Sequence, residues 1–292
     1  MDRKATARET LEIMKRGTYE VGGKTVDISG MHKKSVGNSR LFTPEQAEAI
    51  LGKYPRVRPS APGDSGGSHT AAVTVNCSTV EAILTLAGDG IRNPGVLNFA
   101  SAKNPGGGFL NGAMAQEESI AASSGLYQTL TKNEDYYRNN RNCPSMIYTN
   151  HAIYSPEVVF FRDGRFELLG EPITASVLTL PAVNMGQVIQ KGEDIHEAEA
   201  AMEQRMKLAL ALFAEMGDRN LILGAYGCGV FRNNPYKVAG WWKELLEECF
   251  RGCFDRVVFA VMERSAKGGC LKAFEDMFGC HHVAIRDDLC YT

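Results

Sequence analysis

The sequence feature that most constrains the fold is an apolar strand pattern that runs into a glycine-rich loop and then a carboxylate pair. Residues 95–100 form a short, mostly apolar run that predicts a buried strand. Three consecutive glycines follow at 106–108, and Gln116, Glu117 and Glu118 stand at the expected start of a helix. Glycine permits positive φ and a close approach of backbone to ligand, and successive N–H groups in such a turn bind anions. The pattern therefore predicts a phosphate-binding loop beside two acid–base groups.

A second glycine-rich loop follows another apolar run, at residues 220–225. The stretch 224–235 places three glycines within six residues, and Pro235 suits the first turn of a helix whose N–H groups face the loop. Ligands of parallel sheets bind beyond the carboxyl ends of the strands, so two such loops could hold a diphosphate from both sides. Tyr226 and Phe231 could offer flat faces to a sugar or base, but they would serve equally well as core residues.

Strands and helices are expected to alternate after residue 70, which predicts an α/β fold with a mixed, largely parallel sheet sandwiched between helices. We expect strands at 71–75, 95–100, 174–180, 220–225 and 256–262, a β pair at 146–153 and 157–162 around Pro156, and a hairpin at 19–28. We expect helices at 5–16, after the Thr43–Gln46 capping box, and at 79–87, 117–130, 195–216, 235–248 and 272–277.

The Pro/Gly/Ser-rich stretch 59–68 is the best internal boundary. It divides the chain into an N-terminal helical extension, residues 1–70, packed on the core, and a catalytic domain, residues 71–292. The role of the stretch itself is left open by the sequence.

Composition narrows the class of protein. A net charge of -2 and a pI near 6.3 argue against a dedicated nucleic-acid binder, although backbone amides can still bind an anionic ligand. The N-terminus lacks the apolar core of a signal peptide, and no stretch approaches the ~18 apolar residues of a membrane span. The eight cysteines contain no C-x-x-C pair, which is typical of reduced thiols. We expect a cytoplasmic protein without a membrane partner.

Several candidate groups have simpler interpretations. The two glutamates at a helix start could serve only the helix dipole, which is worth ~0.3–1 kcal/mol. Cys228 could be a nucleophile, but no partner base is evident, which favours a small loop residue. Cys249 and Cys253 could join Cys280, His281 and His282 in a zinc site, but the spacings do not match structural zinc motifs. We therefore expect no metal and no cofactor.

The glycine triplet, seven intervening residues and Gln116-Glu117-Glu118 resemble the signature of the poly(ADP-ribose) glycohydrolases, GGG-x(6–8)-QEE. The stretch 224–234 is similar to the second diphosphate loop of the bacterial-type enzymes. The resemblance implies a macrodomain-like fold over most of the chain. It also implies hydrolysis of the ribose–ribose O-glycosidic bonds of poly(ADP-ribose), free or on modified proteins, with ADP-ribose as product. Exo-type cleavage is the leading interpretation, and the sequence leaves exo and endo cleavage undecided.

The resemblance also implies roles for individual residues. Glu118 would be the general acid that protonates the oxygen leaving C1″ and then helps to activate water, and Glu117 would hold the scissile ribose. Burial beside Glu117 is expected to raise the pKa of this acid. The implied substrate-binding residues are Asn98, Ser101, Asn104, Gly106, Gly107, Gly108, Gln116, Tyr226, Gly227, Cys228, Gly229, Val230 and Phe231. Several family members place an asparagine a few residues before the glycines, with a shorter spacing, to bind the distal ribose. This chain has Ser101 and then Asn104, so the sequence leaves open which of the two makes the contact with the distal ribose.

Two other functions remain alternatives at this point. One is an ADP-ribose-binding macrodomain without hydrolysis, against which Glu118 argues because a pure binding module does not need this glutamate. The other is a hydrolase that removes mono-ADP-ribose from protein or nucleic acid, and the pI argues only weakly against DNA.

Overall fold

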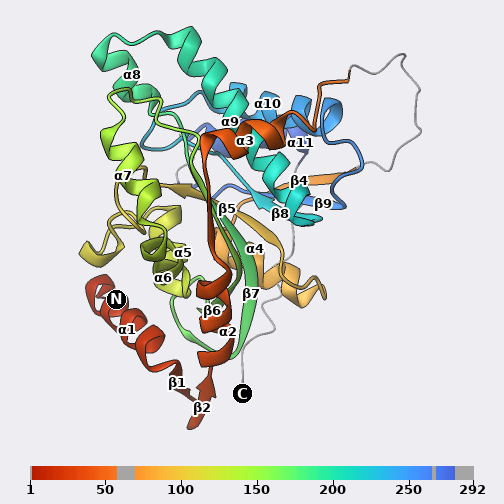
Figure 1. Ribbon diagram of the computed structural model, residues 1–292. Coiled ribbons are helices and arrows are strands. Elements are labelled where there is room, and N and C mark those ends of the chain that lie inside the picture. Colours follow the sequence, from red (N-terminus) through yellow and green to blue (C-terminus); the bar gives the residue numbers. More distant parts are fainter. Residues whose placement is uncertain (1, 58–69, 265–267, 280–292) are drawn as a thin grey trace.

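The centre of the molecule is a seven-stranded mixed sheet between two layers of helices (Figure 1). This computed structural model describes residues 2–57, 70–264 and 268–279. The predicted boundary at 59–68 and the residues Cys280, His281 and His282 therefore lie outside the described residues.

The strand order of the sheet is β3-β6-β7-β5-β8-β9-β4. The strands are β3 (Arg40–Phe42), β4 (Ala71–Val75), β5 (Gly95–Ala100), β6 (Ala152–Arg162), β7 (Leu168–Pro181), β8 (Asn220–Leu223) and β9 (Arg256–Ala260). The strands from β7 to β4 run parallel, whereas β6 and β3 are added antiparallel. The predicted mixed, largely parallel sheet is confirmed. Because β5 and β8 are parallel neighbours, the two glycine-rich loops that follow them leave the same edge of the sheet.

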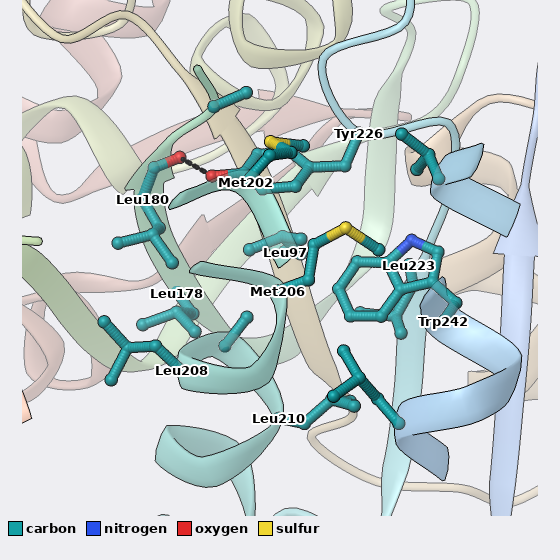
Figure 2. Packing of buried hydrophobic residues seen from close by; sticks show 14 of the residues in the cluster. Leu97, Leu178, Leu180, Met202, Met206, Leu208, Leu210, Leu223, Tyr226 and Trp242 are labelled. Carbon is teal, nitrogen blue, oxygen red and sulfur yellow. Dashed lines mark hydrogen bonds between the residues drawn. The ribbon is translucent and has the colours of Figure 1, made fainter. Parts of the chain in front are cut away.

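Helices cover both faces of this sheet. They are α1 (Arg3–Arg16), α2 (Ser29–Asn38), α3 (Pro44–Leu51), α4 (Thr79–Gly88), α5 (Gln116–Ser123), α6 (Leu126–Lys132), α7 (Glu134–Asn142), α8 (Met185–Lys191), α9 (Ile195–Met216), α10 (Pro235–Glu248) and α11 (Cys270–Phe278), with a 3-10 turn, η1 (Phe109–Asn111). Successive residues of β5 serve opposite layers: Val96 packs in the core with α4, α5 and α6, and Leu97 in the core with α9 and α10. Figure 2 shows Leu97 beside Met206 of α9, with Trp242 of α10 close by. Both faces of β5 are therefore buried, as expected for a central parallel strand.

The N-terminal segment forms the elements predicted for it and adds two. β1 (Thr18–Val21) and β2 (Lys24–Asp27) form the expected antiparallel hairpin. Thr43 and Gln46 make the predicted capping box that opens α3. The unpredicted β3 pairs with β6 at the edge of the main sheet, and the unpredicted α2 begins without a side-chain cap. α1 lies beside α5 and η1 (Figure 1).

The single helix predicted at 117–130 is wrong, because the chain forms α5 and α6 with a break between them. At the break, Ser124 makes an isolated antiparallel bridge to Phe160, and the Gly125 N–H donates to Val159 O at 2.9 Å. The Ser124 hydroxyl donates to Ile120 O at 2.7 Å, at the end of α5. Hydrogen bonds to β6 thus interrupt the helix at Ser124 and Gly125, and local propensity could not predict them.

The predicted β pair around Pro156 is also wrong. Residues 152–162 form one strand, β6, which passes through Pro156 with a register shift between Ser155 and Val158, and such a bulge tolerates a residue without an N–H. Residues 146–150 are not a strand, because oxygen atoms of this segment accept hydrogen bonds from the buried Arg205 guanidinium. It donates to Ile147 O at 2.6 Å and to the Asn150 side chain at 3.0 Å.

No helix among the described residues is both long and apolar enough to cross a membrane. The clearest sequence predictions, the helices at 195–216 and 235–248, are confirmed as α9 and α10.

Candidate active site

Gln116 fixes the start of α5 against the end of β5. Its Oε1 accepts the Phe99 N–H at 2.8 Å, and its Nε2 donates to Leu97 O at 2.7 Å and to Thr79 Oγ1 at 3.2 Å. The side-chain amide thus pairs with the strand backbone as a neighbouring strand would. Its donors and acceptor are all engaged by the protein, so Gln116 positions the glutamates that follow it.

Glu117 is the buried member of the carboxylate pair, with only 3% of its surface exposed. Its Oε2 accepts the Ser101 N–H at 2.7 Å, and its Oε1 faces Asn98 Nδ2 at 3.4 Å. Burial raises the pKa of Glu117 to about 8, and the charge of Glu118 adds to this, although bonds from Ser101, Asn98 and the Gly106 backbone oppose it. The raised pKa therefore favours the protonated form of Glu117 at neutral pH, and that form can donate a hydrogen bond.

Asn98 lies beneath Glu117 in the core, so the predicted contact between Asn98 and a ribose is not supported by its position. It is fully buried, and its Nδ2 also donates to Thr179 Oγ1 at 3.2 Å, while its Oδ1 has no partner among the described residues.

Glu118 is half-buried and bridges α5 and the glycine triplet. Its Oε2 accepts the Ala115 N–H at 2.9 Å, the reach-back bond of a capping box, and its Oε1 accepts the Gly108 N–H at 2.9 Å.

The glycine triplet is shaped around the two carboxyl groups. Gly106 and Gly107 have φ of +65° and +60°. A Cβ at Gly107 would lie 2.3 Å from Glu118 Oε1 and 3.0 Å from Glu117 Oε2, so any side chain there would displace the carboxyl groups. The N–H of Gly106 bonds to Glu117, that of Gly107 to Asn104 O, and that of Gly108 to Glu118. These amides were expected to bind a diphosphate, but in this structure two of them bind the glutamates and the third closes a turn.

Ser101 and Asn104 differ in whether their side chains are available to a ligand. The Ser101 hydroxyl accepts the Asn104 N–H at 3.1 Å and the Lys103 N–H at 3.3 Å, which closes the turn after β5. Asn104 carries an exposed side chain at the mouth of this loop. Of the two, Asn104 has the side chain that is better placed to meet a ligand.

The second loop keeps three successive backbone donors free. Asn233 closes the loop, since its Nδ2 donates to Val183 O at 2.8 Å and to Gly227 O at 3.0 Å, and Gly227 has φ of +71°. Among the described residues, the successive N–H groups of Gly229, Val230 and Phe231 have no protein acceptor, and Val230 is 84% exposed. Consecutive free amides of this kind form an anion-binding concavity. Asn233 was not singled out from the sequence, although an asparagine just before a helix cap would have been a usable signal.

Tyr226 is not a ligand platform, which corrects one sequence interpretation. It is fully buried, its ring centroid lies 5.5 Å from that of Phe99 and 6.5 Å from that of Trp242, and its hydroxyl donates to Leu180 O at 2.9 Å (Figure 2). Phe231 is half-buried, 6.3 Å from the Tyr148 ring, and keeps an accessible face.

Cys228 faces inward from the second loop. A hydrogen bond with Cys270, together with burial, raises the pKa of its thiol. A protonated thiol is a poor nucleophile, so the structure favours a packing role for Cys228.

Two glycine loops on neighbouring parallel strands, with a carboxylate pair at a helix start between sheet and loop, define a macrodomain-like glycohydrolase. The family described as "Microbial-type PARG, catalytic domain" matches residues 7–163, which is more than half of the chain. The chain belongs to this family, the microbial-type poly(ADP-ribose) glycohydrolases.

Solved structures agree with this assignment. The poly(ADP-ribose) glycohydrolase of Thermomonospora curvata superposes with a TM-score of 0.86 at 37% identity, over 94% of this chain and 99% of that chain. Its complex with the inhibitor ADP-HPD gives 0.85 at 36% identity, over 94% and 98%. The Deinococcus radiodurans enzyme in complex with ADP-ribose gives 0.77 at 38% identity, over 86% and 98%. A comparison with curated protein sequences gives no match.

Proposed function

We propose that this enzyme hydrolyses the ribose–ribose O-glycosidic bonds of poly(ADP-ribose) and releases ADP-ribose, with Glu118 as general acid/base. The observation that carries the proposal is the contact of Glu118 with the glycine triplet: its carboxyl is held by the Gly108 N–H at 2.9 Å and lies over Gly107. The similarity to enzymes solved with ADP-ribose and with ADP-HPD supports the choice of ligand.

The ligand's diphosphate would bind the free amides of Gly229, Val230 and Phe231. These donors are pre-formed, so binding needs no rearrangement of the loop, and they bring no side-chain charge. The diphosphate so held would stabilise the positive charge that develops at C1″ in the oxocarbenium-like transition state. Phe231 would pack its accessible face against the sugar.

The two glutamates would divide the remaining chemistry. Glu118 would protonate the oxygen that leaves C1″ and then take a proton from the attacking water. Glu117, neutral and held by Ser101 and Asn98, would donate a hydrogen bond to a ribose hydroxyl without placing a second negative charge beside Glu118. The difference in burial between the two carboxyl groups supports this division of roles.

Two labelled substrates test the proposal. The protein is incubated with poly(ADP-ribose) and, separately, with a protein carrying single ADP-ribose groups, and free ADP-ribose is followed by chromatography. We expect release from the polymer. Release only from the mono-modified protein would replace the proposal by a mono-ADP-ribosyl hydrolase, and binding without any release would replace it by a binding module.

A further inference from the structure

Glu118 borders a second space, a shallow crevice on the side of α1. Its walls come from α1, η1 and the loop after it, α5, and the β6–β7 turn, and its lining residues are Arg3, Thr6, Phe109, Ala113, Met114, Glu118, Ala122 and Phe166. No residue of the second glycine loop lines it. The crevice therefore starts at the proposed acid and leads away from the proposed diphosphate site.

The crevice has an apolar floor. Phe109 and Ala122 are buried in one cluster with Ala7 of α1, which fixes the helix on this loop. Met114 is 37% exposed and Leu110, one residue after Phe109, is 43% exposed. Exposed apolar side chains beside a polar centre suit a flat ring such as a nucleobase.

Arg3 supplies a cation at the rim. The first turn of α1 packs directly on the loop, since a Cβ at Gly112 would lie 3.4 Å from Arg3 Cβ and 3.3 Å from Lys4 Cγ. Among the described residues Arg3 has no ion-pair partner, and the nearby Asp2 carboxylate is engaged by the N–H groups of Lys4 and Ala5, at 3.0 and 3.1 Å. The guanidinium is thus free to meet an anion.

We propose that Arg3 is a specificity-determining residue that binds the diphosphate of the leaving ADP-ribose unit, with the leaving adenine on the apolar floor. The inference rests on the proposed function. The oxygen protonated by Glu118 belongs to the adenosine ribose of the leaving unit, so the leaving adenine lies beside Glu118 and its diphosphate follows further out. An arginine fork matches phosphate oxygens in geometry and charge.

The test compares two substrates that share the retained ADP-ribose unit. One is poly(ADP-ribose); the other is ADP-ribose joined at C1″ to a fluorogenic phenol, which has no leaving diphosphate. The variants are Arg3→Ala and, as a matched control on an exposed position of the same helix outside the crevice lining, Arg8→Ala. The unfolding temperature of each variant is compared with that of wild type, to check that α1 remains packed on the domain.

We expect Arg3→Ala to lower kcat/KM on the polymer about tenfold, mainly through KM, and to leave the fluorogenic substrate within about twofold, because one charge-assisted contact is lost. Raising the salt concentration should shrink the difference between wild type and variant. Arg8→Ala should match wild type on both substrates. Equal effects of Arg3→Ala on both substrates, or no effect on the polymer, would overturn the inference. Failure of the proposed function is distinguishable, since wild type would then release no ADP-ribose from the polymer, whatever it does with the fluorogenic substrate.

Discussion

Replacing Glu117 by glutamine should change how the stability of this enzyme depends on pH. In the folded protein burial raises the pKa of Glu117 to about 8, whereas an unfolded chain releases this proton near the usual 4.5. Between those values the folded state holds one proton more than the unfolded state, so wild-type stability falls as pH rises. Glutamine is neutral at every pH and keeps an acceptor for the Ser101 N–H.

The size of the stability difference follows from the interval between the folded and unfolded pKa values of Glu117. About 3.5 pH units separate the two pKa values, and each unit corresponds to about 1.4 kcal/mol, which sets a ceiling of about 5 kcal/mol. Relaxation around an ionised Glu117 reduces the measured value. The free energy of unfolding of Glu117→Gln, relative to wild type, should therefore rise from pH 5 to pH 8.5 and level off below pH 4.5 and above pH 9.

Urea unfolding of both proteins at pH 5, 6, 7, 8 and 8.5 measures this difference directly. Asp218→Asn is a matched comparison, because burial also raises the pKa of Asp218, but only to about 6, so its difference from wild type should level off about two pH units earlier. Parallel stability curves for wild type and Glu117→Gln across this range would refute the argument that Glu117 is held neutral by burial.

Two further substitutions test the geometry of the site. Gly107→Ala should lower turnover far more than stability, because the new Cβ would lie 2.3 Å from Glu118 Oε1, while the positive φ alone costs roughly 1–2 kcal/mol. The control is Gly90→Ala, which has a similar φ and no atom within 4 Å of the new Cβ, so it should lose only stability. Equal turnover of the two variants would contradict the reasoning. Tyr226→Phe should cost roughly 1–3 kcal/mol of stability, because Leu180 O loses its hydrogen bond, and should leave the ADP-ribose affinity measured by calorimetry unchanged. A drop in affinity without loss of stability would indicate that Tyr226 contacts the ligand.

Much of the site could be predicted because its signals are local. An apolar run, a glycine triplet and the glutamates after it lie within 24 residues of sequence, from 95 to 118, and each indicates its own conformation. The assignments that failed depend on tertiary contacts. Ser124 breaks a helix because β6 offers it a partner, and Tyr226 is buried because α10 covers it. The sequence likewise could not show that burial falls on Glu117 more than on Glu118, since the two are adjacent and chemically identical.

The distinction between the two glycine loops is of the same kind. Both loops contain glycines at positive φ, so both have the composition of an anion site. The loops differ in whether their backbone N–H groups already have acceptors. Those of residues 106–108 bond to Glu117, Asn104 O and Glu118, whereas those of residues 229–231 have no acceptor among the described residues. These hydrogen bonds can be identified only in the three-dimensional structure.

The most direct test of the account is the release of ADP-ribose from labelled poly(ADP-ribose) by Glu118→Gln, measured beside Glu81→Gln. Glu81 makes the same reach-back cap bond, to the Ser78 N–H at 2.7 Å, on a helix that does not carry the proposed acid, so it controls for loss of a cap. We expect Glu118→Gln to lose turnover by about 10²–10⁴-fold while binding ADP-ribose as wild type does, and Glu81→Gln to retain it. Turnover of the polymer by Glu118→Gln at a rate close to wild type would contradict the assignment of the acid.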